Sequence, residues 1–183
     1  MTIKDSAVLK PTTGHYYLAP VGTDLTKAAL LAPPAPWVEV GHTSIEDLLS
    51  ITSDGGDATV LGTLQNPNLR TTYSQRTESM NFTLLQWDAD SLKLYFGSNS
   101  KTLTTTQLGF QSVPSAPTPT STAFAVVFQD GVNAFGVWAP KAEILRGDDF
   151  DLADTESLAG LPLTVKPLNY NTNDWAYAIT PLT

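Results

Sequence analysis

The chain has 183 residues, a length that suits one domain with its own core, and 15% of them are charged, fewer than usual. Its net charge of −8 excludes a general nucleic-acid-binding protein, and the absence of cysteine excludes disulfides and cysteine-ligated metals. We expect neither a secretion signal nor a membrane span, because no apolar run reaches the necessary length.

The first quarter of the chain predicts an arm followed by two strands. Residues 1–13 are polar and close with a proline, so we expect an N-terminal arm that is ordered by contact with another surface. The apolar patterns at 15–21 and 37–42 predict strands, with a short helix at 24–31 as an alternative to a loop between them.

The next stretch predicts a hairpin and an exposed loop. Residues 45–63 contain two apolar runs on either side of the sequence SDGGD, which favours two short strands joined by a glycine turn. Residues 63–76 contain few apolar side chains, so we expect a mobile loop or a surface that binds a partner.

Residues 79–97 predict a strand that leads directly into one short helix. Apolar residues alternate from Ser79 to Trp87, and Asp88 is then a good N-cap residue, while Gly97 is a good helix-ending residue. A helix of about ten residues does not persist alone in water. We therefore expect its apolar stripe to pack on a sheet as part of the protomer core, through Leu92, Tyr95 and Phe96.

The last half of the chain predicts further strands. Two of them are joined by the tight-turn residues Asp130 and Gly131, and the second continues past Pro140, which indicates a sheet edge or a β-bulge. The strands are expected at 102–111, 124–128, 134–138, 141–145, 161–168 and 175–179, with a proline-rich linker at 113–122. The sequence thus predicts a single, mainly β domain over 1–183 with one helix.

No catalytic, metal or cofactor site is expected. His15 and His42 are far apart in the sequence and have no ligand spacing or nucleophile motif, so we interpret both as structural or surface residues. The acidic run DDFDLADTE at 148–156 could bind Ca²⁺, but it lacks the glycine and the spacing of an EF-hand loop. A solvated acidic loop is favoured, and the chain is expected not to be an enzyme.

Three blocks of the sequence resemble a known family. They are WVEVGHTS at 37–44, the long block from SDGGD to FGSNS at 53–100, and PKAEILRGDDFDLADTESLAGLPLTVKPL at 140–168. These blocks are similar to the major tail tube proteins of long-tailed, siphovirus-type bacteriophages, particularly those of actinobacterial phages.

The resemblance implies an antiparallel β-sandwich or half-barrel with one flanking helix, without the appended immunoglobulin-like domain of larger relatives. It also implies hexameric rings that stack into a tube, with an acidic lumen through which the genome passes without specific binding. Tape-measure and tail tip or terminator proteins are the expected partners. The expected location is the virion tail, after assembly in the host bacterial cytoplasm.

Within this family, residues 44–79 are expected to form an extended hairpin or loop that contacts a neighbouring subunit. Arginine and tyrosine are enriched at protein interfaces, which favours the loop side chains as anchors. The expected contact residues are Asp54, Gly55, Gly56, Pro67, Arg70, Tyr73 and Arg76, and the N-terminal arm is a second candidate.

Two alternatives remain open from the sequence. A carbohydrate-binding or adhesion module would also have many short strands, with Trp37, Trp138, Tyr170 and Trp175 available to stack on sugars. A tail terminator or secretion-system tube subunit would share the same fold.

Overall fold

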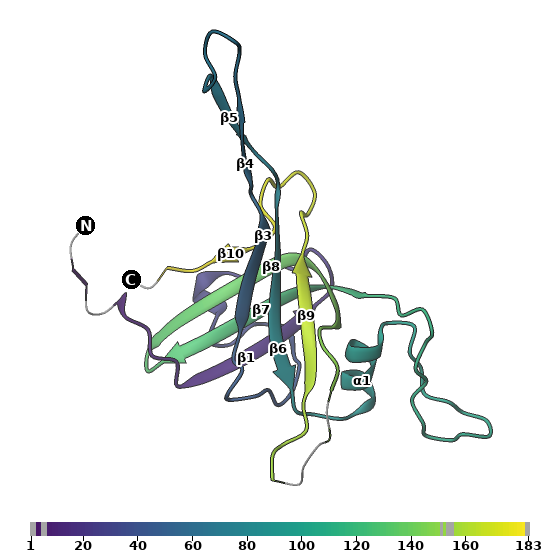
Figure 1. Ribbon diagram of the computed structural model, residues 1–183. Coiled ribbons are helices and arrows are strands. Elements are labelled where there is room, and N and C mark those ends of the chain that lie inside the picture. Colours follow the sequence, from purple (N-terminus) through teal and green to yellow (C-terminus); the bar gives the residue numbers. More distant parts are fainter. Residues whose placement is uncertain (1–2, 5–6, 151, 153–155, 182–183) are drawn as a thin grey trace.

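The computed structural model describes residues 3–4, 7–150, 152 and 156–181, and Figure 1 shows that this part of the chain is built mainly from antiparallel strands. It contains ten strands, one α-helix and a short 3₁₀ helix at Lys27–Ala29. This confirms the predicted fold class. The elements are β1 (Thr13–Ala19), β2 (Val38–Glu39), β3 (Ser50–Gly55), β4 (Ala58–Leu61), β5 (Arg70–Tyr73), β6 (Arg76–Leu84), α1 (Ala89–Phe96), β7 (Thr120–Asp130), β8 (Asn133–Arg146), β9 (Leu161–Pro167) and β10 (Ala178–Ile179).

One sheet folds back on itself to make the body of the protein. Among the described residues, its strands follow the order β2-β1-β7-β8-β9-β6-β3, with β10 also paired to β8. Figure 1 shows β1, β7 and β8 crossing the direction of β3, β6 and β9. Tyr16 of β1 stacks on Phe82 of β6 with ring centroids 4.6 Å apart, although three strands separate them in the sheet. The architecture is therefore a β-sandwich formed by one bent sheet.

The bend in β8 is a β-bulge. Pro140 and Lys141 together lie opposite the single residue Ala123, because the pairing register of β7 and β8 shifts between Thr122 and Phe124. An extra residue bends its strand and leaves a position where proline removes no ladder hydrogen bond. This confirms the predicted bulge, whereas the alternative of an edge is wrong, because β8 lies between β7 and β9.

The core lies between the two halves of the bent sheet. Strand β7 is buried on both faces from Thr122 to Phe128, which explains its continuous apolar sequence. Trp37 covers the outer face and donates its indole N–H to Asp24 O at 3.1 Å. The larger residues of the main core are Tyr16, Met80, Phe82, Leu84, Tyr95, Phe124, Val126, Phe128, Val137, Ile144, Leu161, Leu163 and Val165.

Helix α1 begins and ends where local signals predict. The Asp88 carboxylate accepts a hydrogen bond from Ser91 N–H at 2.8 Å, and Gly97 ends the helix with a φ of +105°. Tyr95 is 1% exposed, and its hydroxyl donates to Asp148 O at 2.7 Å. The other two residues of the predicted stripe, Leu92 and Phe96, are half-buried against the same core.

Several predicted elements are shorter than expected or absent. The strand predicted at 37–42 is reduced to the two residues of β2, and the helix predicted at 24–31 is only the 3₁₀ turn. The strand predicted at 102–111 is wrong, because only a single bridge joins Thr102 to Gln111. Leu108 and Phe110 alternate there without facing a core, and both are at least 70% exposed.

The end of the N-terminal segment next to β1 is bound to its own protomer. Thr12 N–H donates to Gln129 O at 2.8 Å, and Lys10 N–H donates to the Asp130 carboxylate at 3.1 Å. Residues 1–2 and 5–6 of the predicted arm lie outside the described residues. The segment next to β1 is therefore held by the turn between β7 and β8.

Candidate functional site

A two-stranded ribbon projects from the sandwich, as Figure 1 shows for β3 to β6. Strand β3 pairs with β6, from Ser50 opposite Asn81 to Gly55 opposite Arg76. Strand β4 then pairs with β5 in the same register, with Ala58 opposite Tyr73. The four strands are thus the two arms of one long hairpin, and its outer half lies beyond the body.

This arrangement corrects the hairpin predicted at 45–63. Strands β3 and β4 do not pair with each other, because Gly55 and Gly56 interrupt one arm of the ribbon instead of reversing it. Their φ angles are +85° and +79°, a conformation that favours glycine. A Cβ on Gly55 would lie 2.6 Å from Gln75 O. The two glycines therefore mark a close approach of the two arms.

The segment at 63–76 is also more ordered than a mobile loop. It contains β5, and the chain reverses in a compact tip at 62–69. Thr63 N–H donates to Asn66 O at 2.8 Å, and Asn66 N–H donates back to Thr63 O at 3.2 Å. A Cβ on Gly62 would lie 2.0 Å from Pro67 O, so only glycine fits there. The tip has a defined shape before any partner binds.

The outer half of the ribbon exposes apolar side chains. Leu64 is 94% exposed, Leu69 is 60% exposed and Tyr73 is 73% exposed. Alternation along the strands places Leu61 and its partner Arg70 on one face, and Val60 on the other. A two-stranded ribbon is marginally stable alone, and clustered apolar side chains on a surface mark an interaction site.

The seven predicted contact residues all lie on this ribbon, in two groups. Pro67, Arg70 and Tyr73 lie on its outer half, where they are exposed. The remaining four, Asp54, Gly55, Gly56 and Arg76, lie at the junction between its halves. Arg76 packs across Gly56, because a Cβ there would lie 2.5 Å from Arg76 Nε.

Sequence reasoning missed the leucines of the outer half. Leu61, Leu64 and Leu69 are all at least half-exposed, although the segment was expected to contribute mainly polar and aromatic contacts. The sequence signal for an apolar surface here is the presence of these three leucines in a segment whose apolar residues follow neither helix nor strand periodicity. Arg70 is the only charged residue from Ala58 to Gln75.

Near the base of the ribbon, Tyr177 ties the C-terminal segment to β6. Its hydroxyl donates to the Glu78 carboxylate, and this hydrogen bond, followed by burial, raises the pKa of Tyr177 to about 12. The Tyr177 hydroxyl therefore keeps the proton that it donates in this hydrogen bond across the neutral range of pH.

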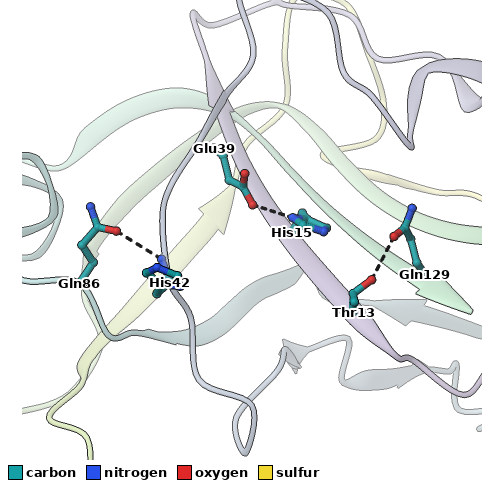
Figure 2. Close-up of polar contacts among 6 residues, drawn as sticks. All are labelled: Thr13, His15, Glu39, His42, Gln86 and Gln129. Carbon is teal, nitrogen blue, oxygen red and sulfur yellow. Dashed lines mark hydrogen bonds and ion pairs between the residues drawn. The ribbon is translucent and has the colours of Figure 1, made fainter.

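The two histidines have separate surroundings, which Figure 2 shows. His15 Nδ1 lies 2.6 Å from Glu39 Oε1, which joins β1 to β2. His42 N–H donates to Gln86 Oε1 at 3.4 Å, so this contact involves the backbone of His42. Beside them, Thr13 Oγ1 donates to Gln129 Oε1 at 3.0 Å. These contacts join strands and neighbouring segments.

In the described part of the acidic run, Asp149 pairs with Arg146 at 3.7 Å. Asp151 and Asp154, two of its candidate Ca²⁺ ligands, lie outside the described residues. Within the described ranges, no group of three or more His, Asp or Glu side chains is placed to hold a metal ion.

The four aromatics of the carbohydrate-binding alternative do not form one exposed platform. Trp37 is 7% exposed, and Trp138 donates its indole N–H to Thr23 O at 3.2 Å. Trp175 packs beside Trp138 with ring centroids 5.7 Å apart, and Tyr170 lies against Gly22. Their main role is therefore packing within the protomer.

Comparison with known proteins identifies the family. A family model described as phage tail tube protein matches residues 1–182. No curated protein matches the chain. In the part of the chain that the structure describes, no helix has the length and apolar character to cross a membrane. Because the family model covers nearly the whole sequence, the chain belongs to the phage tail tube protein family.

Proposed function

We propose that this protein is the self-assembling structural subunit of a tail tube, forming hexameric rings that stack and conduct the viral genome. Family membership gives it a structural role in the phage tail tube. The observation that carries the finer proposal is the exposed ribbon from β3 to β6. The resemblance of the sequence supports a siphovirus-type tail of an actinobacterial phage.

The ribbon supports assembly because its outer half contributes nothing to its own protomer's core. Leu64, Leu69 and Tyr73 are exposed beyond the body, on a ribbon with two unpaired edges. Such a structure becomes stable when a second surface covers its apolar side chains. Arg70 and Tyr73 are the side chains best suited to anchor it.

Sheet edges support closure of the ring. Strand β2 ends one side of the main sheet and β3 ends the other, so each leaves backbone groups without a strand partner in the described protomer. Pairing of such edges between neighbours would join six sheets into one barrel and remove the edges. The net charge of −8 suits an inner wall along which phosphates slide without binding.

In this role the protein needs no catalytic group or cofactor. Its partners are further copies of itself, the tape-measure protein, and tail tip or terminator proteins. Assembly takes place in the bacterial cytoplasm, and the finished tube is part of the virion.

Negative-stain microscopy of concentrated protein, with and without tail tips as seeds, tests the proposal. We expect rings and tubes with six-fold end views. A particle that stays monomeric at every concentration would falsify the assembly role. Single rings that never stack would instead favour a tail terminator, and glycan binding without assembly would favour the carbohydrate-binding module.

A pair of matched substitutions tests the ribbon. Leu64→Ser and Val132→Ser each remove a highly exposed aliphatic side chain, 94% exposed on the ribbon and 91% exposed at the turn between β7 and β8. We expect Leu64→Ser to lower tube yield and Val132→Ser to leave it unchanged, while both keep the wild-type melting temperature. Equal tube yields in the two variants would refute the ribbon as the assembly contact.

A further inference from the structure

We propose that the tip of the ribbon docks into a groove at the opposite end of the same sheet on a second copy of this chain. This inference rests on the proposed tube function and names the surface that receives the ribbon. The groove, of about 480 Å³, lies where β3 begins, β6 ends and β9 begins.

The groove and the tip have complementary charge. The ionisable side chains that line the groove are all carboxylates, from Glu46, Asp47 and Asp148. Arg70, the first residue after the tip, is the one charged residue between Ala58 and Gln75. Opposite charges at an interface select the correct partner and its register.

The groove and the tip also match in apolar character. Below the carboxylates the groove is lined by Leu48, Leu49 and Phe82, which pack against the main core. The tip offers Leu64 and Leu69, and Leu61 lies beside Arg70 on one face of the ribbon. Apolar side chains would fill the floor while the guanidinium meets the acidic rim.

A second groove, at the base of the ribbon, fits less well. It is lined by Arg76 as well as by Glu78 and Asp174, so a cation already stands in it. Glu78 also already accepts the hydrogen bond of Tyr177. Arg70 of another copy would meet a like charge there, which disfavours docking.

The position of the groove has a consequence for assembly. The ribbon leaves the sheet at Gly55 and Arg76, whereas the groove lies at Ser50 and Thr83, the other end of β3 and β6. A contact between opposite ends of identical copies is heterologous, and it builds an open stack when no closing rotation relates successive copies. Because the ribbon and the groove lie at opposite ends of the same strands, we expect docking to continue in one direction, as an open stack in which every copy points the same way.

The length of the ribbon sets the repeat of this stack. From Leu48 in the groove to Leu64 at the tip, the chain spans no more than about 55 Å at the rise of an extended strand. We expect an axial repeat between stacked copies of no more than about 55 Å, measured from images of the tubes. A clearly longer repeat would overturn the docking.

Thiol cross-linking tests the contact directly, because the wild-type chain contains no cysteine. In assembled tubes of a Leu64→Cys/Leu48→Cys variant, a short bis-maleimide should link copies into a ladder of linear multimers on a denaturing gel. The matched control, Leu64→Cys/Asp174→Cys, places the second thiol in the other groove and should give no ladder.

The outcomes separate this proposal from the proposed function. Tubes without a Leu64–Leu48 ladder, or with a ladder only in the control variant, would overturn the docking and leave the tube role intact. A wild-type protein that never assembles would overturn both.

Charge reversal gives a second measurement. We expect Arg70→Glu to raise the concentration needed for tube formation by about tenfold, and Lys101→Glu, an equal change of charge on another exposed loop, to have little effect. Adding Glu46→Arg and Asp148→Arg to Arg70→Glu should recover most of the loss. No recovery in this triple variant, with its melting temperature unchanged, would refute the pairing.

Discussion

Two buried tyrosines allow a matched pair of substitutions with opposite expected signs. Tyr16 and Tyr95 are each 1% exposed in the main core. The Tyr95 hydroxyl donates to Asp148 O at 2.7 Å, whereas the Tyr16 hydroxyl has no hydrogen-bond partner among the described residues. Burial also raises the pKa of Tyr16. Replacement by phenylalanine removes the hydroxyl from each site and keeps the ring.

The magnitudes follow from these two environments. Tyr95→Phe loses one hydrogen bond, which should lower the free energy of unfolding by about 1 kcal/mol. Tyr16→Phe removes a buried hydroxyl that is desolvated without compensation, so it should raise the free energy of unfolding by about 1 kcal/mol. For a domain of this size, 1 kcal/mol shifts the melting temperature by roughly 2–4 °C. The two variants should therefore differ by about 4–8 °C.

Thermal and urea unfolding of dilute protein, followed by circular dichroism, would measure both changes. Tyr73→Phe is the control, because Tyr73 is 73% exposed on the ribbon and the loss of its hydroxyl should not change stability. Shifts of the same sign at Tyr16 and Tyr95 would refute the reasoning, since they would mean that the Tyr16 hydroxyl is as well satisfied as that of Tyr95.

Two further substitutions test the helix cap and the ribbon tip. Asp88→Ala should lower the free energy of unfolding by about 0.5–2 kcal/mol, because it removes the acceptor of Ser91 N–H. The hydrogen bond from Ser91 N–H is the largest cause of a lowered pKa of the Asp88 carboxyl, and the hydrogen bond from Gln86 is the next. The stabilisation by Asp88 is therefore present above the ordinary carboxyl pKa of 3.8, and it is lost as the pH falls through the lowered pKa. Wild-type and variant stabilities should therefore converge in acid, and a constant gap down to pH 2 would contradict the assignment. Gly62→Ala should lower tube yield without changing the melting temperature of the sandwich, because its Cβ would lie 2.0 Å from Pro67 O; wild-type tube yield in this variant would show that the shape of the tip is unimportant.

Local signals were sufficient for the helix and for the hairpin of β7 and β8. Asp88 and Gly97 are adjacent to the helix that they limit, and the turn residues Asp130 and Gly131 lie within a single chain reversal. In such elements the interactions that fix the structure are close in sequence. These elements can therefore be predicted from short stretches of the sequence.

The ribbon could not be predicted in the same way. Gly55 and Gly56 match a turn, but the partners of β3 and β4 lie on the returning arm, after the tip at 62–69. Neither periodicity nor turn preference shows which of two strands a segment will pair with. The resemblance to a known family predicted an extended hairpin or loop at 44–79, whereas the sequence pattern placed the chain reversal at the two glycines instead of at 62–69.

The sequence also did not predict how the sheet bends so that its two halves pack against each other. Tyr16 and Phe82 each fit an alternating strand pattern, yet nothing in either pattern indicates that their rings stack. The same limit explains the error at 102–111, where Leu108 and Phe110 alternate but remain exposed. Alternation identifies a face of a segment, and the tertiary structure decides whether that face is covered.

The bulge at Pro140 and Lys141 affects how the protomer carries mechanical load. Before the bulge β8 pairs with β10, and after it β8 pairs with β9, so one covalent strand belongs to both walls of the sandwich. Two separate sheets can slide or separate along the layer between them, because only side-chain packing holds them together. Here a force that enters one wall through the ribbon reaches the other through a continuous backbone. Strand β8 therefore couples the two walls mechanically. Strain along a stack of copies would be shared by both walls of the sandwich.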